Sequence, residues 1–144
     1  MSSLEVEALV ENLDTVFAFL HKELKQYGVG MHMKVDVAVE EIFVNIASYA
    51  YDPETGPAKI TVEEAEDPKR IVIRFEDRGK PYNPLVREEM DIAEHNRERK
   101  VGGLGIFMAK RNMDNLYYEY EDGWNVVTME KLMKEEEEPE KEEK

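Results

Sequence analysis

The chain has 144 residues, a formal net charge of -14 and no cysteine. This length fits one domain with a sizeable core, and the lack of cysteine excludes disulfides and thiolate zinc sites. The negative charge disfavours direct binding to nucleic acids and favours basic protein partners. No apolar run approaches the roughly 20 residues that span a bilayer, so we expect a cytoplasmic protein without membrane contact.

The first part of the chain predicts one strand and two helices. Apolar and charged residues alternate over 4–8, as in a short strand, and apolar residues recur at helical spacing over about 12–27. Gly28 and Gly30 are expected to end that helix. A second helix is predicted over about 31–50. It is apolar around most of its circumference and should be the central buried helix.

The remainder predicts two hairpins with a lid and a third helix between them. The hairpins comprise 58–65 with 70–76, and 116–120 with 126–132. Charged residues 82–101 are interpreted as a mobile lid and 103–113 as a helix. We therefore expect an α+β fold, a two-layer α/β sandwich with helices on one face of a mostly antiparallel sheet. This domain would cover 1–133, and the acidic segment 134–144 would be a disordered tail.

A first candidate site lies in the predicted central helix, where Glu41 and Asn45 are four residues apart and so share a face. Asparagine is a poor helix former and needs a partner when buried. Its amide oxygen suits Mg²⁺, and Glu41 could take a proton from a hydroxyl or water attacking phosphorus. The alternative is a solvated Glu41 and an Asn45 that caps a neighbouring backbone group.

A second candidate site follows the strand predicted at 70–76. Asp77 could accept a hydrogen bond from an exocyclic amine such as that of adenine, and Gly79 leaves space for a flat ring. An ordinary Asp-x-Gly turn closed by Pro81 and Pro84 explains the same residues equally well.

A third candidate site is the glycine cluster Gly102, Gly103 and Gly105, which opens the predicted third helix. Helix N-termini bind anions, and glycine lets a phosphate approach the backbone. Arg99 and Lys100 precede the cluster and could close over the charge. The segment fits neither a P-loop nor a dinucleotide fingerprint, and a tightly packed helix start is the alternative.

Segments 41–45, 77–84 and 102–106 together resemble the N, G1 and G2 boxes of the Bergerat-fold (GHKL) ATPases. Over about residues 4–133 the chain is most similar to the bacterial anti-sigma regulatory factors of the RsbW and SpoIIAB type, which are serine/threonine protein kinases. The resemblance implies ATP and Mg²⁺ as cofactors, with Glu41 as general base and Asn45 as magnesium ligand. It also implies an adenine and phosphate site that consists of Asp77, Gly79, Pro81, Arg99, Lys100, Gly102, Gly103, Leu104 and Gly105.

Members of this family hold a sigma factor inactive and phosphorylate a serine or threonine of a STAS-domain anti-anti-sigma protein, and they commonly form homodimers through a sheet edge. The chain departs from the pattern at Tyr82, where phenylalanine is usual, and at Tyr49 and Ala50, where many members have histidine and a small residue. The second departure, with the acidic tail, leaves open whether the chain binds a sigma factor or regulates something else. The boxes also do not exclude the alternative of a nucleotide-gated interaction module with little or no kinase activity. The ATPase domain of a histidine kinase is disfavoured, because no helices with a phosphoacceptor histidine precede residue 1.

Overall fold

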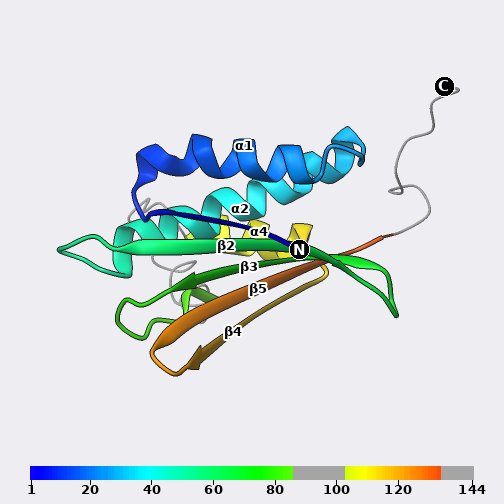
Figure 1. Cartoon of the computed structure of the whole chain (residues 1–144). Helices are drawn as coiled ribbons and strands as arrows, with labels where there is room; N and C mark the ends of the chain where they lie inside the picture. Colours follow the sequence, from blue (N-terminus) through cyan, green and yellow to red (C-terminus); the bar gives the residue numbers. More distant parts are fainter. Residues whose placement is uncertain (86–102, 134–144) are drawn as a thin grey trace, which may run out of the picture.

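A five-stranded antiparallel sheet forms one layer of the fold, and the helices form the other (Figure 1). The structure, a computed structural model, describes residues 1–85 and 103–133, with side chains described for 1–85 and 107–133. The strand order is β1-β2-β3-β5-β4. The strands are β1 (Ser2–Glu7), β2 (Pro57–Ala65), β3 (Arg70–Asp77), β4 (Asn115–Glu121) and β5 (Trp124–Leu132).

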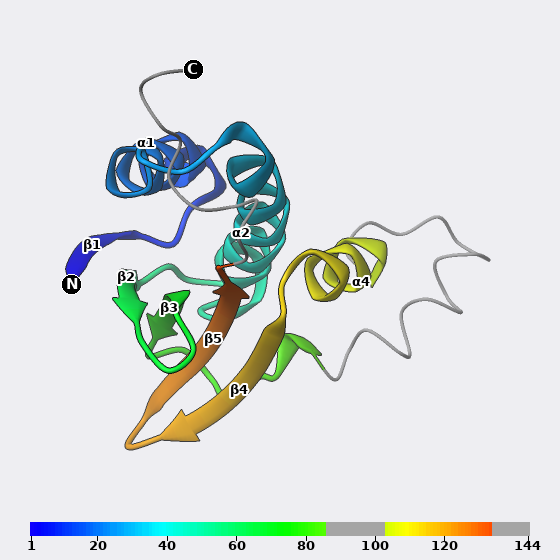
Figure 2. The ribbon, with the colours of Figure 1, turned by 90° about the vertical axis from the view of Figure 1, so that its right-hand side faces the viewer.

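Within the described residues, three α-helices cover one face of this sheet, which confirms the expected α+β sandwich (Figure 2). They are α1 (Leu13–Glu23), which follows the 3-10 turn Val10–Asn12, α2 (Val29–Tyr49) and α4 (Gly103–Asn112). None of the described helices is long and apolar enough to cross a bilayer. The predicted lid lies outside the described residues from position 86 onward.

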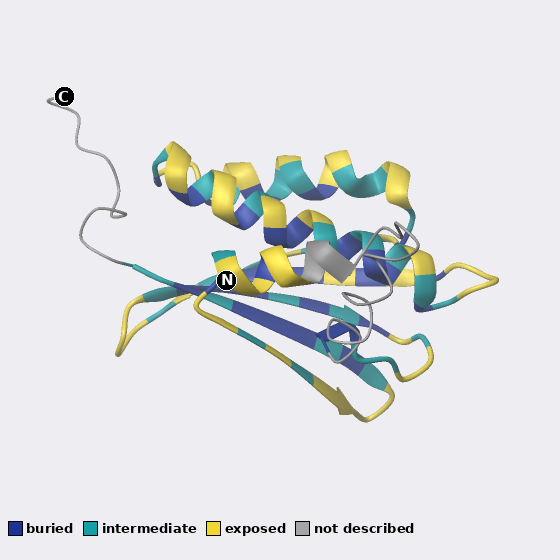
Figure 3. Cartoon of the chain, turned by 180° about the vertical axis from the view of Figure 1, so that it is seen from behind, coloured by how far each residue is buried: buried dark blue, intermediate teal, exposed yellow. Residues whose placement is uncertain are grey.

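The core lies between α2 and the central strand β3. Ile71, Ile73 and Phe75 alternate along β3 and are fully buried, because successive residues of a strand point to opposite faces of the sheet. Ile42 and Phe43 of α2 are fully buried as well, so the predicted central helix is confirmed. Figure 3 shows this buried layer and the exposed edge strand β4. One side of α2 nevertheless stays exposed, and it carries Val29, Met33 and Val37.

Two predicted helix boundaries are wrong. α1 ends at Glu23, four residues before the predicted end, although Leu24 and Tyr27 beyond it remain buried. The apolar spacing continues past the helix because the turn that follows still packs on the core. Gly28 is the N-cap of α2, while Gly30 lies inside α2 and does not stop a helix.

Candidate functional site

Glu41 and Asn45 contact each other on α2. The Asn45 amide nitrogen donates to the Glu41 backbone carbonyl at 2.8 Å and to Glu41 Oε2 at 3.3 Å. The first bond is the backbone capping considered as the alternative, and it explains how a buried asparagine is accommodated within the helix. With the nitrogen engaged in this way, the amide oxygen Oδ1 is the atom that a cation would meet.

The half-buried position of Glu41 changes its acidity. Burial raises the pKa of the carboxyl group, the neighbouring charge of Glu40 raises it further, and the hydrogen bond from Asn45 lowers it in part. A carboxylate with a raised pKa holds an abstracted proton more firmly, which suits a general base.

Asp77 is buried at the end of β3 and is fixed by two hydrogen bonds. Its Oδ1 accepts from the Gly79 backbone N–H at 2.9 Å and from Asn125 Nδ2 at 2.9 Å. Because both bonds end on Oδ1, a ligand amine would meet Oδ2. Burial raises the pKa of Asp77, and the two hydrogen bonds oppose that rise without cancelling it.

The loop after Asp77 rests directly on the C-terminal end of α2. A Cβ atom at Gly79 would lie 2.1 Å from the Ala50 carbonyl oxygen, and the Lys80 N–H donates to that same oxygen at 3.0 Å. The rings of Tyr49 and Tyr82 also lie 5.5 Å apart between their centroids. Gly79 is therefore required for close packing against Ala50, whatever space it leaves for a ligand. The loop after Asp77 therefore packs against the end of the helix that carries Glu41 and Asn45.

Asn125 of β5 is the main partner of this loop, and the motif analysis missed it. Its Nδ2 also donates to the Lys80 carbonyl at 3.0 Å and to the Gly79 carbonyl at 3.3 Å. Its Oδ1 accepts from the Tyr82 N–H at 3.2 Å and from the Tyr118 hydroxyl. Asn125 lies one residue before the strand predicted at 126–132, and no motif in the sequence marks it.

Tyr51 forms a second unpredicted link to the loop. Its hydroxyl donates to the Pro57 carbonyl at 2.6 Å and accepts from the Arg78 N–H at 2.8 Å. The hydroxyl therefore joins the start of β2 to the first residue of the loop.

The third candidate site is described only in part. Gly103, Leu104 and Gly105 lie in the first turn of α4, which packs against α2 above the same face of the sheet (Figure 2). The side chain of Leu104 is not described. Arg99, Lys100 and Gly102 lie outside the described residues, so their predicted roles stay predictions.

Pro81 lies at the rim of the site. With Gly79, Lys80 and Tyr120 it lines a hollow of about 440 Å³. Glu41, Asn45 and Asp77 are not among the described residues that line this hollow, so it flanks the site and does not join the candidate residues.

The described residues offer few protein ligands for a metal ion. No group of three or more histidine, cysteine, aspartate or glutamate side chains gathers within 1–85 and 107–133 in a way that could hold one. Mg²⁺ bound mainly through substrate phosphates and water needs only one or two protein oxygen ligands. The Asn45 amide oxygen fits that requirement.

Residues 6–131 match the histidine kinase-like ATPase domain. The chain belongs to this family. The resemblance inferred from the three boxes is therefore confirmed at the level of the ATPase family.

Individual members of the histidine kinase-like ATPase family are similar to this chain at modest identity. A serine/threonine-protein kinase, BtrW of Bordetella bronchiseptica, is 24% identical over 117 residues, which cover 81% of this chain and 82% of that protein. The serine-protein kinases RsbW of Listeria monocytogenes and Listeria innocua are 29% and 28% identical over 95 residues. Those matches cover 63% of this chain and 60% of each RsbW protein.

Proposed function

We propose that this chain is an ATP-binding anti-sigma regulatory factor that phosphorylates a serine or threonine of a STAS-domain antagonist and sequesters a sigma factor. The observation that carries the proposal is the contact between the Ala50 carbonyl and the loop at Gly79 and Lys80, which packs the Asp77 loop against the end of the helix that carries Glu41 and Asn45. Family membership supports ATP as the ligand. The names of the relatives support protein serine/threonine kinase activity.

Asp77 binds the adenine in this proposal. Asn125 and the Gly79 N–H hold Oδ1, so that Oδ2 accepts a hydrogen bond from the exocyclic amine of the base. Glu41 lies more than two helical turns before Ala50 on the same helix and takes the proton from the substrate hydroxyl as its oxygen attacks the γ-phosphorus. The bond to the β-phosphate oxygen breaks and ADP leaves with the electron pair.

Mg²⁺ held at Asn45 Oδ1 would neutralise charge on the transferred phosphoryl group. Gly102, Gly103 and Gly105, with Arg99 and Lys100, are proposed to contact the phosphates from the start of α4.

The proposed partners are proteins, with no direct contact to nucleic acid or membrane. The net charge of -14 favours partners with basic surfaces. We expect a cytoplasmic homodimer that pairs through a sheet edge, for which β1 and β4 are the available strands.

The decisive experiment measures transfer of labelled γ-phosphate from ATP to a STAS-domain protein. Glu41→Gln should lower the transfer rate about 10²- to 10⁴-fold, because the general base is lost, and should leave ATP affinity within a few-fold. Glu66→Gln is the control, because it removes an exposed carboxylate in the β2–β3 turn, at the other end of β3 from Asp77, and should retain most activity.

Unchanged transfer by Glu41→Gln would exclude Glu41 as the base. If the wild-type protein binds its partner only with nucleotide but transfers no phosphate, the chain acts as a nucleotide-gated interaction module.

A further inference from the structure

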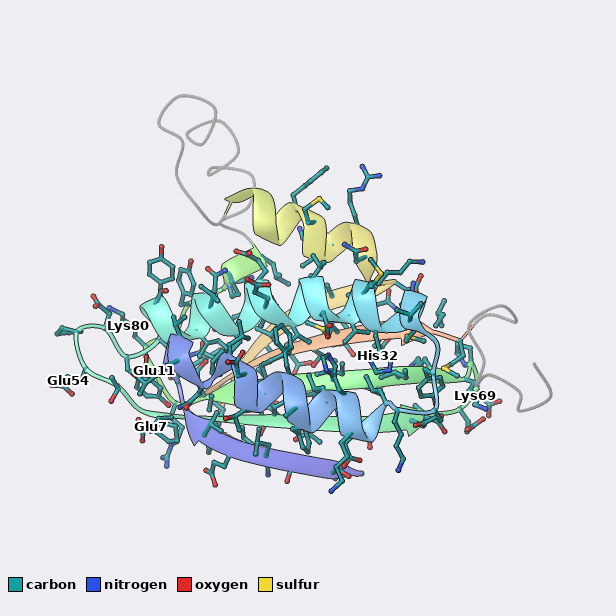
Figure 4. All side chains as sticks on the ribbon, turned by 90° about the horizontal axis from the view of Figure 1, so that it is seen from above. Glu7, Glu11, His32, Glu54, Lys69 and Lys80 are labelled. Atoms are coloured by element: carbon teal, nitrogen blue, oxygen red, sulfur yellow. The ribbon has the colours of Figure 1, made fainter. Side chains whose placement is uncertain are left out.

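A cavity of about 170 Å³ lies at the opposite end of β3 from Asp77. It is partly open to solvent and is lined by the start of β1, the end of α1, and the facing ends of β2 and β3. Glu64 and Ile71 in its wall flank the β2–β3 turn, which contains Lys69. Lys69 and Lys80 mark the two ends of the molecule in Figure 4. The cavity is therefore separate from the proposed nucleotide site.

The inner wall of the cavity is apolar. Leu24, Val62 and Ile71 line it and are at least 95% buried. This wall suits an aliphatic stem, because covering apolar surface is favourable. The volume is well below the roughly 300–1,000 Å³ of pockets for drug-sized ligands, and a cavity of about 150 Å³ accommodates about six non-hydrogen atoms.

The remaining wall is acidic. Glu23, Glu63 and Glu64 line the cavity, and the only positively charged group among the described residues that line it is the amino terminus at Met1. Arg74 offsets the charge of Glu63 through an ion pair of 3.1 Å, and Glu23 accepts a hydrogen bond from the Ser2 hydroxyl at 2.7 Å. Excess negative charge beside an apolar wall favours a ligand with a cationic head and an aliphatic stem.

The Tyr27 hydroxyl independently indicates a ligand. Tyr27 lines the cavity, and only 4% of the residue is exposed. Its hydroxyl has no hydrogen-bond partner within the residues that the structure describes. An unpaired buried hydroxyl costs about 1–3 kcal/mol. A donor or acceptor brought by a ligand would remove that cost.

We propose that this cavity binds an alkylammonium or alkylguanidinium group. Its stem packs against Leu24, Val62 and Ile71 while its charged head lies among the glutamates and donates a hydrogen bond to the Tyr27 hydroxyl oxygen. The group is carried either by a free aliphatic amine or by a lysine or arginine side chain of a partner protein, and both present the same chemistry.

The test is an NMR titration of the full chain with n-butylguanidinium and with N-butylurea, its uncharged isostere. The cation should produce saturable shifts of backbone amides in 23–27 and 62–64, and the urea should not. Tyr27→Phe and Glu64→Gln should each weaken binding about three- to tenfold, because each removes one polar contact. Glu66→Gln is the control, since Glu66 lies in the turn outside the cavity.

Two further arms sharpen the test. A capped Gly-Arg-Gly peptide that binds more tightly than free butylguanidinium would assign the group to a partner protein, and the reverse order would assign it to a small molecule. Glu41→Gln should bind the cation as the wild type does, which separates this site from the proposed kinase activity. Absence of saturable shifts, equal binding of the urea, or unchanged affinity in Tyr27→Phe would overturn the proposal.

Discussion

The buried polar groups at the two ends of β3 differ in their hydrogen bonding. At the C-terminal end, Asp77 and Asn125 are buried and both are hydrogen-bonded within the chain. At the N-terminal end, the buried Tyr27 hydroxyl has no partner among the described residues. Paired groups fix a shape before any ligand arrives, whereas an unpaired group gains its partner only on binding. One end is therefore preorganised and the other is completed by a ligand.

The largest effect is expected for Asn125→Ala. The substitution removes the partner of the buried Asp77 carboxylate and of three part-buried loop groups, and an unpaired buried group costs about 1–3 kcal/mol. We expect at least about 3 kcal/mol lower free energy of unfolding in urea and a large loss of ATP affinity. Asn115→Ala removes an exposed bond to Glu130 and should change stability by less than about 0.5 kcal/mol. Equal losses in the two variants would show that the loop does not depend on Asn125.

Gly79→Ala should have the next largest effect. Its Cβ would overlap the Ala50 carbonyl oxygen, and such overpacking costs about 1–3 kcal/mol. ATP affinity should fall as well, because the loop must move away from α2. Gly30→Ala is the matched control near Tyr27, where a Cβ meets no atom within 4 Å inside a helix. It should stabilise the protein by about 0.5–1 kcal/mol, and a loss there would contradict this account of the two glycines.

A smaller effect is expected from the ionisation of Asp77. Its pKa is raised on folding, so its stabilising contribution is present below the ordinary value of 3.8 and is lost as the pH rises through the folded pKa. The difference in unfolding free energy between wild type and Asp77→Asn should therefore fall as the pH rises from 3.8. Urea titrations of both proteins at several pH values measure it, and a pH-independent difference would refute the raised pKa.

The smallest effect is expected for Tyr27→Phe without ligand. Removing a hydroxyl that the chain does not pair should leave the melting temperature unchanged or slightly higher. Thermal unfolding monitored by circular dichroism provides the measurement. A loss comparable to that of Asn125→Ala would show that the hydroxyl is already paired in the folded chain and that the two ends do not differ.

The sequence predicted the fold well where its signals are local. The central helix α2 and the hairpin β2–β3 follow from the spacing of apolar residues, and both are observed. The predicted end of α1 was wrong because the helical spacing of apolar residues continues through the following turn to Tyr27. Periodicity reports which residues face the core, and it does not separate a helix from a packed turn.

Only those residues of the candidate site that lie within the sequence motifs were predicted. Glu41, Asn45 and Asp77 could be found because helix spacing and strand ends are visible in a single segment. Asn125, Tyr51 and Tyr118 contact the loop from segments far away in the sequence. Such partners depend on strand register, in this case the pairing of Asp77 with Asn125, which no local pattern encodes.

The hydrogen bond from the Lys80 N–H to the Ala50 carbonyl fixes a distance in the proposed site. It ties the loop after Asp77 to the last turn of the helix that carries Glu41, and nine helical residues span about 13 Å. The helix therefore holds Glu41 at a fixed distance from the loop that follows Asp77. In the proposed function, the number of phosphates, and not the base alone, would then decide whether a nucleotide reaches Glu41.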